Sequence, residues 1–136
     1  MKVSPYLTFN GNCEEAFKFY EQCLGGKILF MMKNAGSPME DKVASESLDK
    51  ILHATLSVGT TLLMASDVPP DQYQAPQGIS VSLEMADATE AERIYHALAE
   101  GGTVQCPIQE TFWATRFGMA VDRFGIPWMI NCSKTP

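Results

Sequence analysis

The sequence predicts an α+β protein made of two tandem βαβββ modules, whose curved mixed sheets form a concave cavity. The segment SPYLTF at residues 4–9 recurs as SVSLEM at residues 80–85, an offset of 76 residues. Each copy leads into apolar residues at helical spacing, and each helical segment stops at a Gly-Gly pair, residues 25–26 and 101–102. Paired modules of this kind commonly hold a ligand between their related halves, which is where we expect the cavity.

The first module opens with residues 3–10, which alternate as a strand does. Asn12 is the expected N-cap of the following helix, because acidic residues fill its first turn. The helix is expected to end at the Gly-Gly pair, where one glycine adopts the left-handed conformation. Residues 27–32 are the second expected strand.

A polar segment without periodicity, residues 33–50, interrupts the first module and is expected to be functional or mobile. Residues 51–58 and 60–66 then predict a hairpin around Gly59. The proline-containing stretch that follows is predicted to be a linker. We therefore expect a single domain in which module 1 covers about residues 1–66, the linker residues 67–77, and module 2 about residues 78–136.

The second module repeats the scheme of the first. Its first strand is expected at residues 78–86 and its helix at about 88–100. Three further strands are expected in the rest of the module, near residues 103–106, 114–121 and 126–132, with a turn at residues 122–125.

Alternation along each strand predicts which side chains face the cavity. Apolar residues at every second position are expected under the helices: Leu52, Ala54, Leu56 and Val58 in module 1, and Ile79, Val81, Leu83 and Met85 in module 2. The intervening residues are then expected on the concave face, and they include Ser4, Tyr6, Thr8, His53, Thr55, Ser57, Ser80, Ser82 and Glu84. Near the C-terminus, Trp128 is expected in the core and Met129 in the cavity.

Composition narrows the classes of partner. The 136 residues carry a net charge of −6 and no basic stripe, which argues against nucleic acid. No apolar run approaches the length of a membrane span, so no membrane partner is expected, and the first residues lack the apolar core of a signal peptide. The four cysteines form no Cys-x-x-Cys pair and are expected to be reduced, structural thiols in a cytoplasmic protein.

Two stretches resemble a known family. The segment PYLTFNGN at residues 5–12 resembles the opening of the PhnB-like subgroup of the vicinal oxygen chelate superfamily, which includes glyoxalase I, bleomycin-resistance proteins and extradiol dioxygenases. The segment ETFWA at residues 110–114, DRFG at 122–125 and WMIN at 128–131 resemble the C-terminal signature of that subgroup. The resemblance implies the paired-module fold and a homodimer.

Superfamily members with known chemistry hold a divalent metal through the first and last strands of each module. Carried over by motif, these positions fall at or next to Ser4, Met64, Ser80 and Met129. Hydroxyls and thioethers suit a hard divalent cation poorly, so we expect no metal and no other cofactor.

Several residues are candidates for the ligand site. Glu84, His53 and Glu110 are the candidate catalytic groups, although the resemblance assigns none of them a role. The residues expected to bind the ligand are Tyr6, His53, Met64, Glu84, Phe112, Trp113 and Met129.

The preferred interpretation is a protein that binds a small organic molecule in a cavity lacking the usual metal ligands. The alternative is a metal-dependent lyase, isomerase or dioxygenase that uses a nonstandard ligand set, whose turnover a chelator would abolish. A third interpretation, a scaffold with a filled core, predicts no stabilisation by any ligand.

Overall fold

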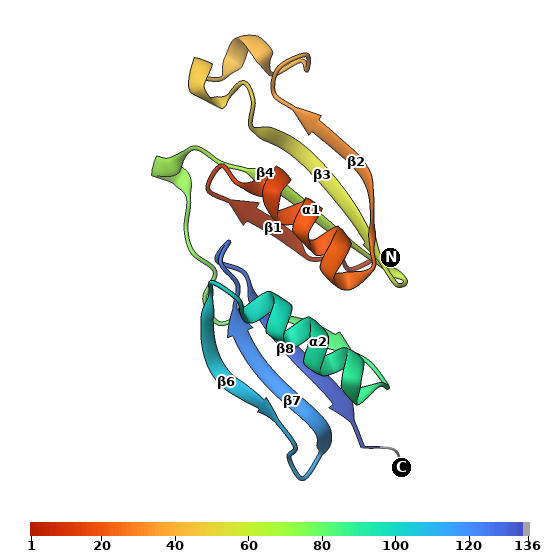
Figure 1. Cartoon of the computed structure of the whole chain (residues 1–136). Helices are drawn as coiled ribbons and strands as arrows, with labels where there is room; N and C mark the ends of the chain where they lie inside the picture. Colours follow the sequence, from red (N-terminus) through yellow and green to blue (C-terminus); the bar gives the residue numbers. More distant parts are fainter. Residues whose placement is uncertain (135–136) are drawn as a thin grey trace. The chain divides into compact units, whose positions relative to one another are not determined.

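A computed structural model describes residues 1–134 and divides them into two units, the first spanning Met1–Gln74 and the second beginning at Ala75. Each unit is one βαβββ module, so the predicted α+β class and module plan are confirmed (Figure 1). The elements of the first unit are β1 (Tyr6–Phe9), α1 (Cys13–Leu24), β2 (Lys27–Lys33), β3 (Ile51–Val58) and β4 (Thr61–Asp67). Short 3₁₀ turns cover Glu40–Lys42, Ser45–Ser47 and Pro70–Gln72.

The second unit repeats the first. Its elements are β5 (Val81–Glu84), α2 (Ala88–Ala99), β6 (Thr103–Gln109), β7 (Ala114–Val121) and β8 (Pro127–Ser133). Sheet 1 has the strand order β1-β4-β3-β2, and sheet 2 has the equivalent order β5-β8-β7-β6. The first strand of each module runs parallel to the last, whereas the other pairs are antiparallel. The two helices are each 12 residues long and lie 75 residues apart in the sequence.

Each helix covers one face of its own sheet and buries its apolar stripe there. In unit 1, Phe9 of β1 meets Phe17 of α1 edge to face, with ring centroids 6.2 Å apart, and Tyr20 joins the same cluster. In unit 2, a Cβ atom added at Gly118 of β7 would lie 2.7 Å from the ring of Tyr95 on α2. Glycine is therefore required there, because helix and strand approach too closely for a side chain.

The Gly-Gly pairs owe their repetition to two separate constraints. The first glycine of each pair, Gly25 (φ 72°) and Gly101 (φ 75°), has the left-handed conformation that glycine adopts without strain. The second glycine lies against the backbone of the adjacent sheet, where a Cβ at Gly26 would meet the Ser57 carbonyl oxygen and one at Gly102 the Val121 carbonyl oxygen. Each helix therefore ends at a turn that only this dipeptide fits.

Asn12 occupies the N-cap position of α1, as the sequence predicted, and its carbonyl accepts from the Ala16 amide at 3.0 Å. Its side chain makes no capping hydrogen bond. Instead Asp67, at the end of β4, accepts hydrogen bonds from the Cys13 amide (3.0 Å) and, through its second oxygen, from the Ile51 amide (2.9 Å). One carboxylate thus ties the start of α1 to the start of β3. In unit 2 the cap is local, because Asp87 accepts from the Thr89 amide at 2.8 Å.

Two side-chain orientations differ from the expected alternation. A register shift between β2 and β3 at Met32/Lys33 leaves Ile51 buried, whereas Leu52, expected under α1, is only partly buried. Ile79, expected under α2, precedes β5 and is 73% exposed. Strand β5 is four residues long, so the period-two pattern at residues 79–85 extends beyond the strand itself.

A buried carboxylate organises the turn between β7 and β8. Asp122 accepts hydrogen bonds from the amides of Phe124 (2.9 Å) and Ile126 (3.0 Å). Its second oxygen accepts from the indole nitrogen of Trp128 at 2.8 Å. Trp128 is fully buried, as the sequence predicted, and Gly125 takes φ 95° at the end of the turn.

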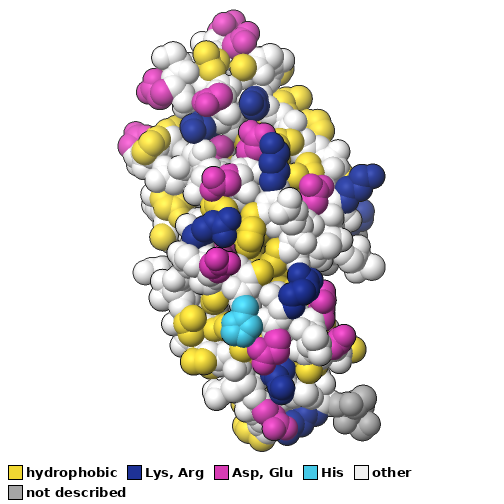
Figure 2. Space-filling model, viewed as in Figure 1, with side chains coloured by type: hydrophobic (Ala, Val, Ile, Leu, Met, Phe, Trp, Pro, Cys, Tyr) yellow, Lys and Arg dark blue, Asp and Glu magenta, His cyan; other side chains and the backbone are white. Residues whose placement is uncertain are grey.

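The charged surface is mixed in sign. On the face drawn in Figure 2, Lys and Arg side chains lie among Asp and Glu, with no extended patch of either. Pairs along the helices contribute to this pattern, including Glu14 with Lys18 (2.8 Å) and Glu90 with Arg93 (2.7 Å). The Lys18 hydrogen bond lowers the pKa of the Glu14 carboxyl below its usual range. Among residues 1–134, no helix is long and apolar enough to cross a membrane.

Replacement of Asp122 should lower the urea concentration at which unit 2 unfolds. Asp122→Ala leaves three donors without their acceptor, at roughly 1–3 kcal/mol for each buried group, so we expect at least ~3 kcal/mol of destabilisation. Asp122→Asn keeps one oxygen acceptor and should lose less. Urea unfolding followed by tryptophan fluorescence measures the effect, with the exposed Asp71→Ala as control. An Asp122→Ala midpoint equal to that of the control would contradict this assignment.

The four free cysteines should differ in reactivity. Cys13, Cys23 and Cys132 are buried, whereas Cys106 is partly exposed on the edge strand β6. Burial raises the pKa of the Cys13 thiol, and the neighbouring Asp67 carboxylate raises it further. Because the thiolate is the reactive species, Ellman's reagent should modify Cys106 alone in the native protein and all four after unfolding. Peptide mapping by mass spectrometry identifies the site, and fast native modification of Cys13 would be the contrary result.

Candidate functional site

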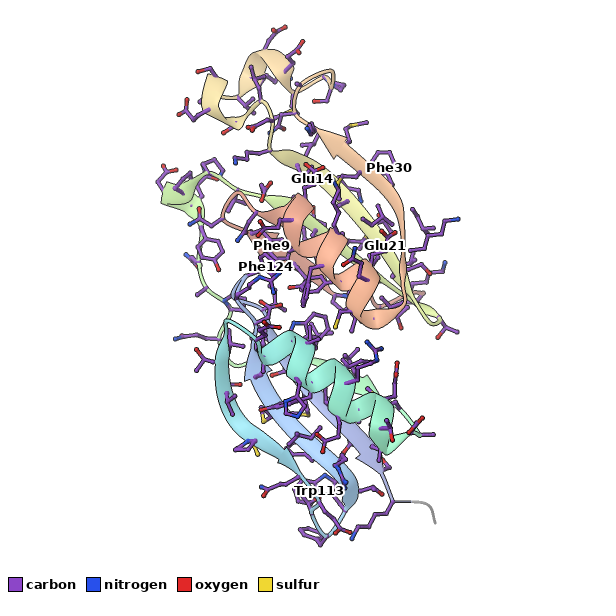
Figure 3. The ribbon with its side chains drawn as sticks, in the orientation of Figure 1. Phe9, Glu14, Glu21, Phe30, Trp113 and Phe124 are labelled. Carbon is purple, nitrogen blue, oxygen red and sulfur yellow. The ribbon has the colours of Figure 1, made fainter. Side chains whose placement is uncertain are left out.

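Each unit carries a candidate site of its own, the face of its sheet that the helix leaves uncovered. These two faces are here called the helix-free faces. On sheet 1, pairing aligns Tyr6, Met64, Thr55 and Phe30 in one row across all four strands. The neighbouring row Leu7, Ala65 and Ala54 is buried toward α1. Because adjacent rows point to opposite faces, the Tyr6 row stands on the helix-free face. Tyr6 and Phe30 are 50% and 44% exposed there, and Figure 3 labels Phe30 on β2.

His53 lies within this aromatic surface. Its ring centroid is 5.9 Å from that of Tyr6 and 5.9 Å from that of Phe30. Its Nε2 is 3.3 Å from the Thr55 hydroxyl, two residues along the same strand. Met32 pairs with His53 across β2 and β3 and extends the surface. The imidazole is therefore positioned between two rings, with a hydroxyl as its polar neighbour.

Sheet 2 presents an equivalent face. One row across β5, β8 and β7 consists of Ser82, Met129 and Met119. A second row on the same face, two residues further along β5, consists of Glu84, Asn131 and Phe117. The intervening row, Leu83, Ile130 and Gly118, faces α2. The Oδ1 atom of Asn131 is buried and has no hydrogen-bond partner among the described residues, while its amide nitrogen donates to Ser133 at 2.9 Å.

A cavity of about 850 Å³ lies over one end of this face, wholly within unit 2. Its floor includes Ser82, Met119 and Met129, and the segment 76–80 forms part of its wall. Ile79 lines it as well, which explains why that apolar side chain is not packed under the helix. The size and the thioether lining suit a small organic molecule.

The connection between β6 and β7 carries an aromatic group. Trp113, which Figure 3 labels at this turn, lies edge to face with Phe112 at 4.8 Å and with Phe117 at 5.2 Å between centroids. Phe112 is 88% exposed, and Trp113 is also exposed. Phe117 belongs to the helix-free face of sheet 2, so Trp113 extends the aromatic surface of that face.

The acidic candidates are less organised than the aromatic ones. Glu84 is exposed at the end of β5, and Glu110 forms an ion pair with Lys134 at 3.3 Å. Glu84 lies on β5 and Glu110 follows β6, and these are the two opposite edge strands of sheet 2. The structure of unit 2 therefore does not bring these two carboxylates together as an acid–base pair.

The positions that the resemblance implied for a metal are Ser4, Met64, Ser80 and Met129. Tyr6 pairs with Met64 and Ser82 with Met129, whereas Ser4 and Ser80 precede β1 and β5. Neutral hydroxyls and soft thioethers fit a hard divalent cation poorly, because such a cation prefers carboxylate and carbonyl oxygens. Within residues 1–134, no group of three or more His, Cys, Asp or Glu side chains could hold a metal ion.

Sequence reasoning missed Phe30, Met32 and Met119. Alternation places Phe30 and Met32 on the same side of the strand at residues 27–32, and pairing with Thr55 and His53 shows that this side is the helix-free one. Met119 lies two residues after Phe117 on β7, so both side chains point to the same face of sheet 2. The pairing of β7 with β8 identifies that face as the helix-free one. In the wall at residues 76–80, alternation predicted Ser80 on the concave face, and Ser80 does line the cavity, whereas residues 76 and 77 were assigned only to the linker.

Comparisons with known proteins agree with this geometry. The family model described as 3-demethylubiquinone-9 3-methyltransferase matches residues 1–131. Protein YjdN of Escherichia coli strain K12 is 33% identical over 142 residues, which cover 98% of this chain and 97% of YjdN. Protein PA1353 from Pseudomonas aeruginosa has a crystal structure that matches with a TM-score of 0.91 and 49% identity, over 99% of both chains.

More distant structures share the fold. A PhnB protein from Bacillus cereus matches with a TM-score of 0.82 and 21% identity over 96% of this chain and 98% of its own. The fosfomycin resistance protein FosX from Listeria monocytogenes, solved with Mn(II), matches with a TM-score of 0.68 and 9% identity over 98% and 93%. This chain belongs to the family described as 3-demethylubiquinone-9 3-methyltransferase.

Proposed function

We propose that this protein binds a small, largely apolar organic molecule on the helix-free faces of its sheets. The observation that carries the proposal is the cavity of about 850 Å³ over sheet 2, which has Met129 and Met119 in its floor. Binding sites for small molecules are typically concave and apolar, with a few polar groups that fix orientation. Ser82 and Gln105 supply such groups in the lining.

Sheet 1 supports the same function with a different surface. Tyr6, Phe30 and Met32 are exposed on its helix-free face around His53. Aromatic rings provide flat contact area, and the flexible thioethers of Met32 and Met64 adapt to an irregular ligand. An exposed apolar surface in a soluble protein commonly marks an interaction site. We therefore propose that Tyr6, His53 and Met64 contact the ligand.

We favour binding over catalysis because of the groups around His53. A general base or nucleophile needs a partner and usually a third group that orients the base. The hydrogen-bonding partner of His53 is Thr55, at the long distance of 3.3 Å. The alternative function is a metal-dependent lyase, isomerase or dioxygenase with a nonstandard ligand set, to which His53 would contribute. If a metal were involved, chelation would abolish turnover but leave binding of an apolar ligand intact.

The family description names a methyl transfer that we do not adopt. Methyl donors of the nucleotide type are commonly bound at a glycine-rich turn between a strand and a helix. In the β1-to-α1 connection, residues 10–12, Gly11 is the only glycine. Sequestration of an organic compound, as in bleomycin-resistance relatives, requires nothing beyond a pocket. By the same family analogy we propose a cytoplasmic homodimer.

Truncation of the helix-free faces should weaken binding of a neutral dye. We expect Met129→Ala and Phe30→Ala each to raise the dissociation constant for Nile red several-fold, because each substitution removes apolar contact area worth about 1–2 kcal/mol. Fluorescence titration measures the constant. The control is Val104→Ala, which truncates an exposed apolar residue on edge strand β6. Val104 lies in the same row as buried Trp128, so it belongs to the helix side of sheet 2 and not to the helix-free face. Equal affinity in all four proteins would overturn the proposal.

A further inference from the structure

A second cavity, of about 540 Å³, lies in unit 1 away from the helix-free faces. The segment between β2 and β3 forms one wall, and residues 67–70, at and after the end of β4, form another. Figure 1 shows this segment extending beyond the end of sheet 1, in orange to yellow. Neither Tyr6, His53 nor Met64 lines the cavity, so it is separate from the site proposed above.

The wall formed by this segment is a folded structure with a closed base. Asn34 is buried, its amide nitrogen donates to the Ser47 carbonyl at 2.9 Å, and its backbone amide donates to the Lys50 carbonyl at 3.0 Å. The Ser37 hydroxyl, also buried, donates to the Asn34 carbonyl at 2.7 Å. The loop is thus closed by its own hydrogen bonds, as compact functional loops are.

The cavity combines apolar walls with one partly buried cation. The apolar lining residues are Met39, Val43, Leu52, Val68, Pro69 and Pro70. The Lys50 Nζ donates to the Gly11 carbonyl at 3.2 Å, which leaves two of its three N–H donors for other partners. Among residues 1–134, no ion pair includes Lys50.

The two carboxylates of the lining differ in availability. Both oxygens of Asp67 already accept backbone hydrogen bonds, from Cys13 and Ile51. Glu46 is exposed, and the Ser45 hydroxyl lies 3.4 Å from one of its oxygens. A partly desolvated ammonium gains most from an anionic partner, so the lining favours an acid with an apolar body.

We propose that this cavity binds a small aliphatic carboxylate, whose carboxylate accepts hydrogen bonds from Lys50 and whose chain lies against Leu52, Val68 and Met39. The bound anion completes the donor set of Lys50, and the chain covers the apolar wall. The ligand is recognised by its charge at one end and its hydrocarbon at the other.

Three probes of equal chain length test the proposal: octanoate, octanol and octylammonium. Calorimetric titration of the wild-type protein should show octanoate binding more tightly than octanol, with octylammonium weakest. In a protein labelled at methionine methyl groups, octanoate should shift the Met39 resonance and leave Met64 unchanged. Octylammonium binding as tightly as octanoate, or an unperturbed Met39, would overturn the proposal.

Substitutions of Lys50 test the charge separately. Lys50→Met keeps a stem of similar length but removes the ammonium, and loss of a charged hydrogen bond should weaken octanoate about tenfold or more while octanol is unaffected. Lys50→Arg should keep most of the affinity. Lys42→Met, in the same segment but outside the lining, should bind as the wild type does. If Lys50→Met does not fold, Lys50→Gln replaces it, and an octanoate affinity unchanged by removal of the charge contradicts the inference.

Discussion

The parallel pairing of the first strand of each module with its last strand determines the rest of the site. In unit 1 this pairing sets Tyr6 beside Met64, and in unit 2 it sets Ser82 beside Met129. Since rows alternate between faces, the same register commits Leu7 and Leu83 to the helix side. A shift of β4 or β8 by one residue would turn Met64 or Met129 to the helix side. Apolar burial under each helix therefore stabilises the orientation of the candidate site.

Two carboxylates stabilise the connections on which this register depends. Asp67 ties the start of α1 and the start of β3 to the end of β4. Asp122 ties the β7–β8 turn to Trp128, one residue before Met129. Each carboxylate accepts hydrogen bonds from backbone amides that would otherwise lack a partner. A buried amide without a partner lowers the free energy of unfolding. The hydrogen bonds of Asp122 thus fix the start of the strand that carries Met129.

Much of this arrangement could be predicted from sequence, because it follows from period and from turn chemistry. The helix bounds, the strand at Ala114–Val121 and the burial of Trp128 came from alternation and the Gly-Gly pairs. The errors lie where tertiary contacts override local pattern. Asn12 holds the N-cap position as predicted, but the side chain that accepts from the first turn is that of Asp67, 55 residues away. The sequence marked residues 33–50 as functional or mobile but did not indicate the cavity beside Lys50, since the cavity depends on the folding of that segment against Val68 and Pro69.

Methionine methyl NMR of the full chain, titrated with Nile red, tests the central claim most directly. The eight methionines report on every relevant surface: Met32 and Met64 on the helix-free face of sheet 1, Met119 and Met129 on that of sheet 2, and Met31 on the helix side. The account predicts shifts confined to the helix-free faces, with Met31 and Met39 unchanged. No shift at any methionine of those faces, or shifts at Met31 or Met39 instead, would contradict it.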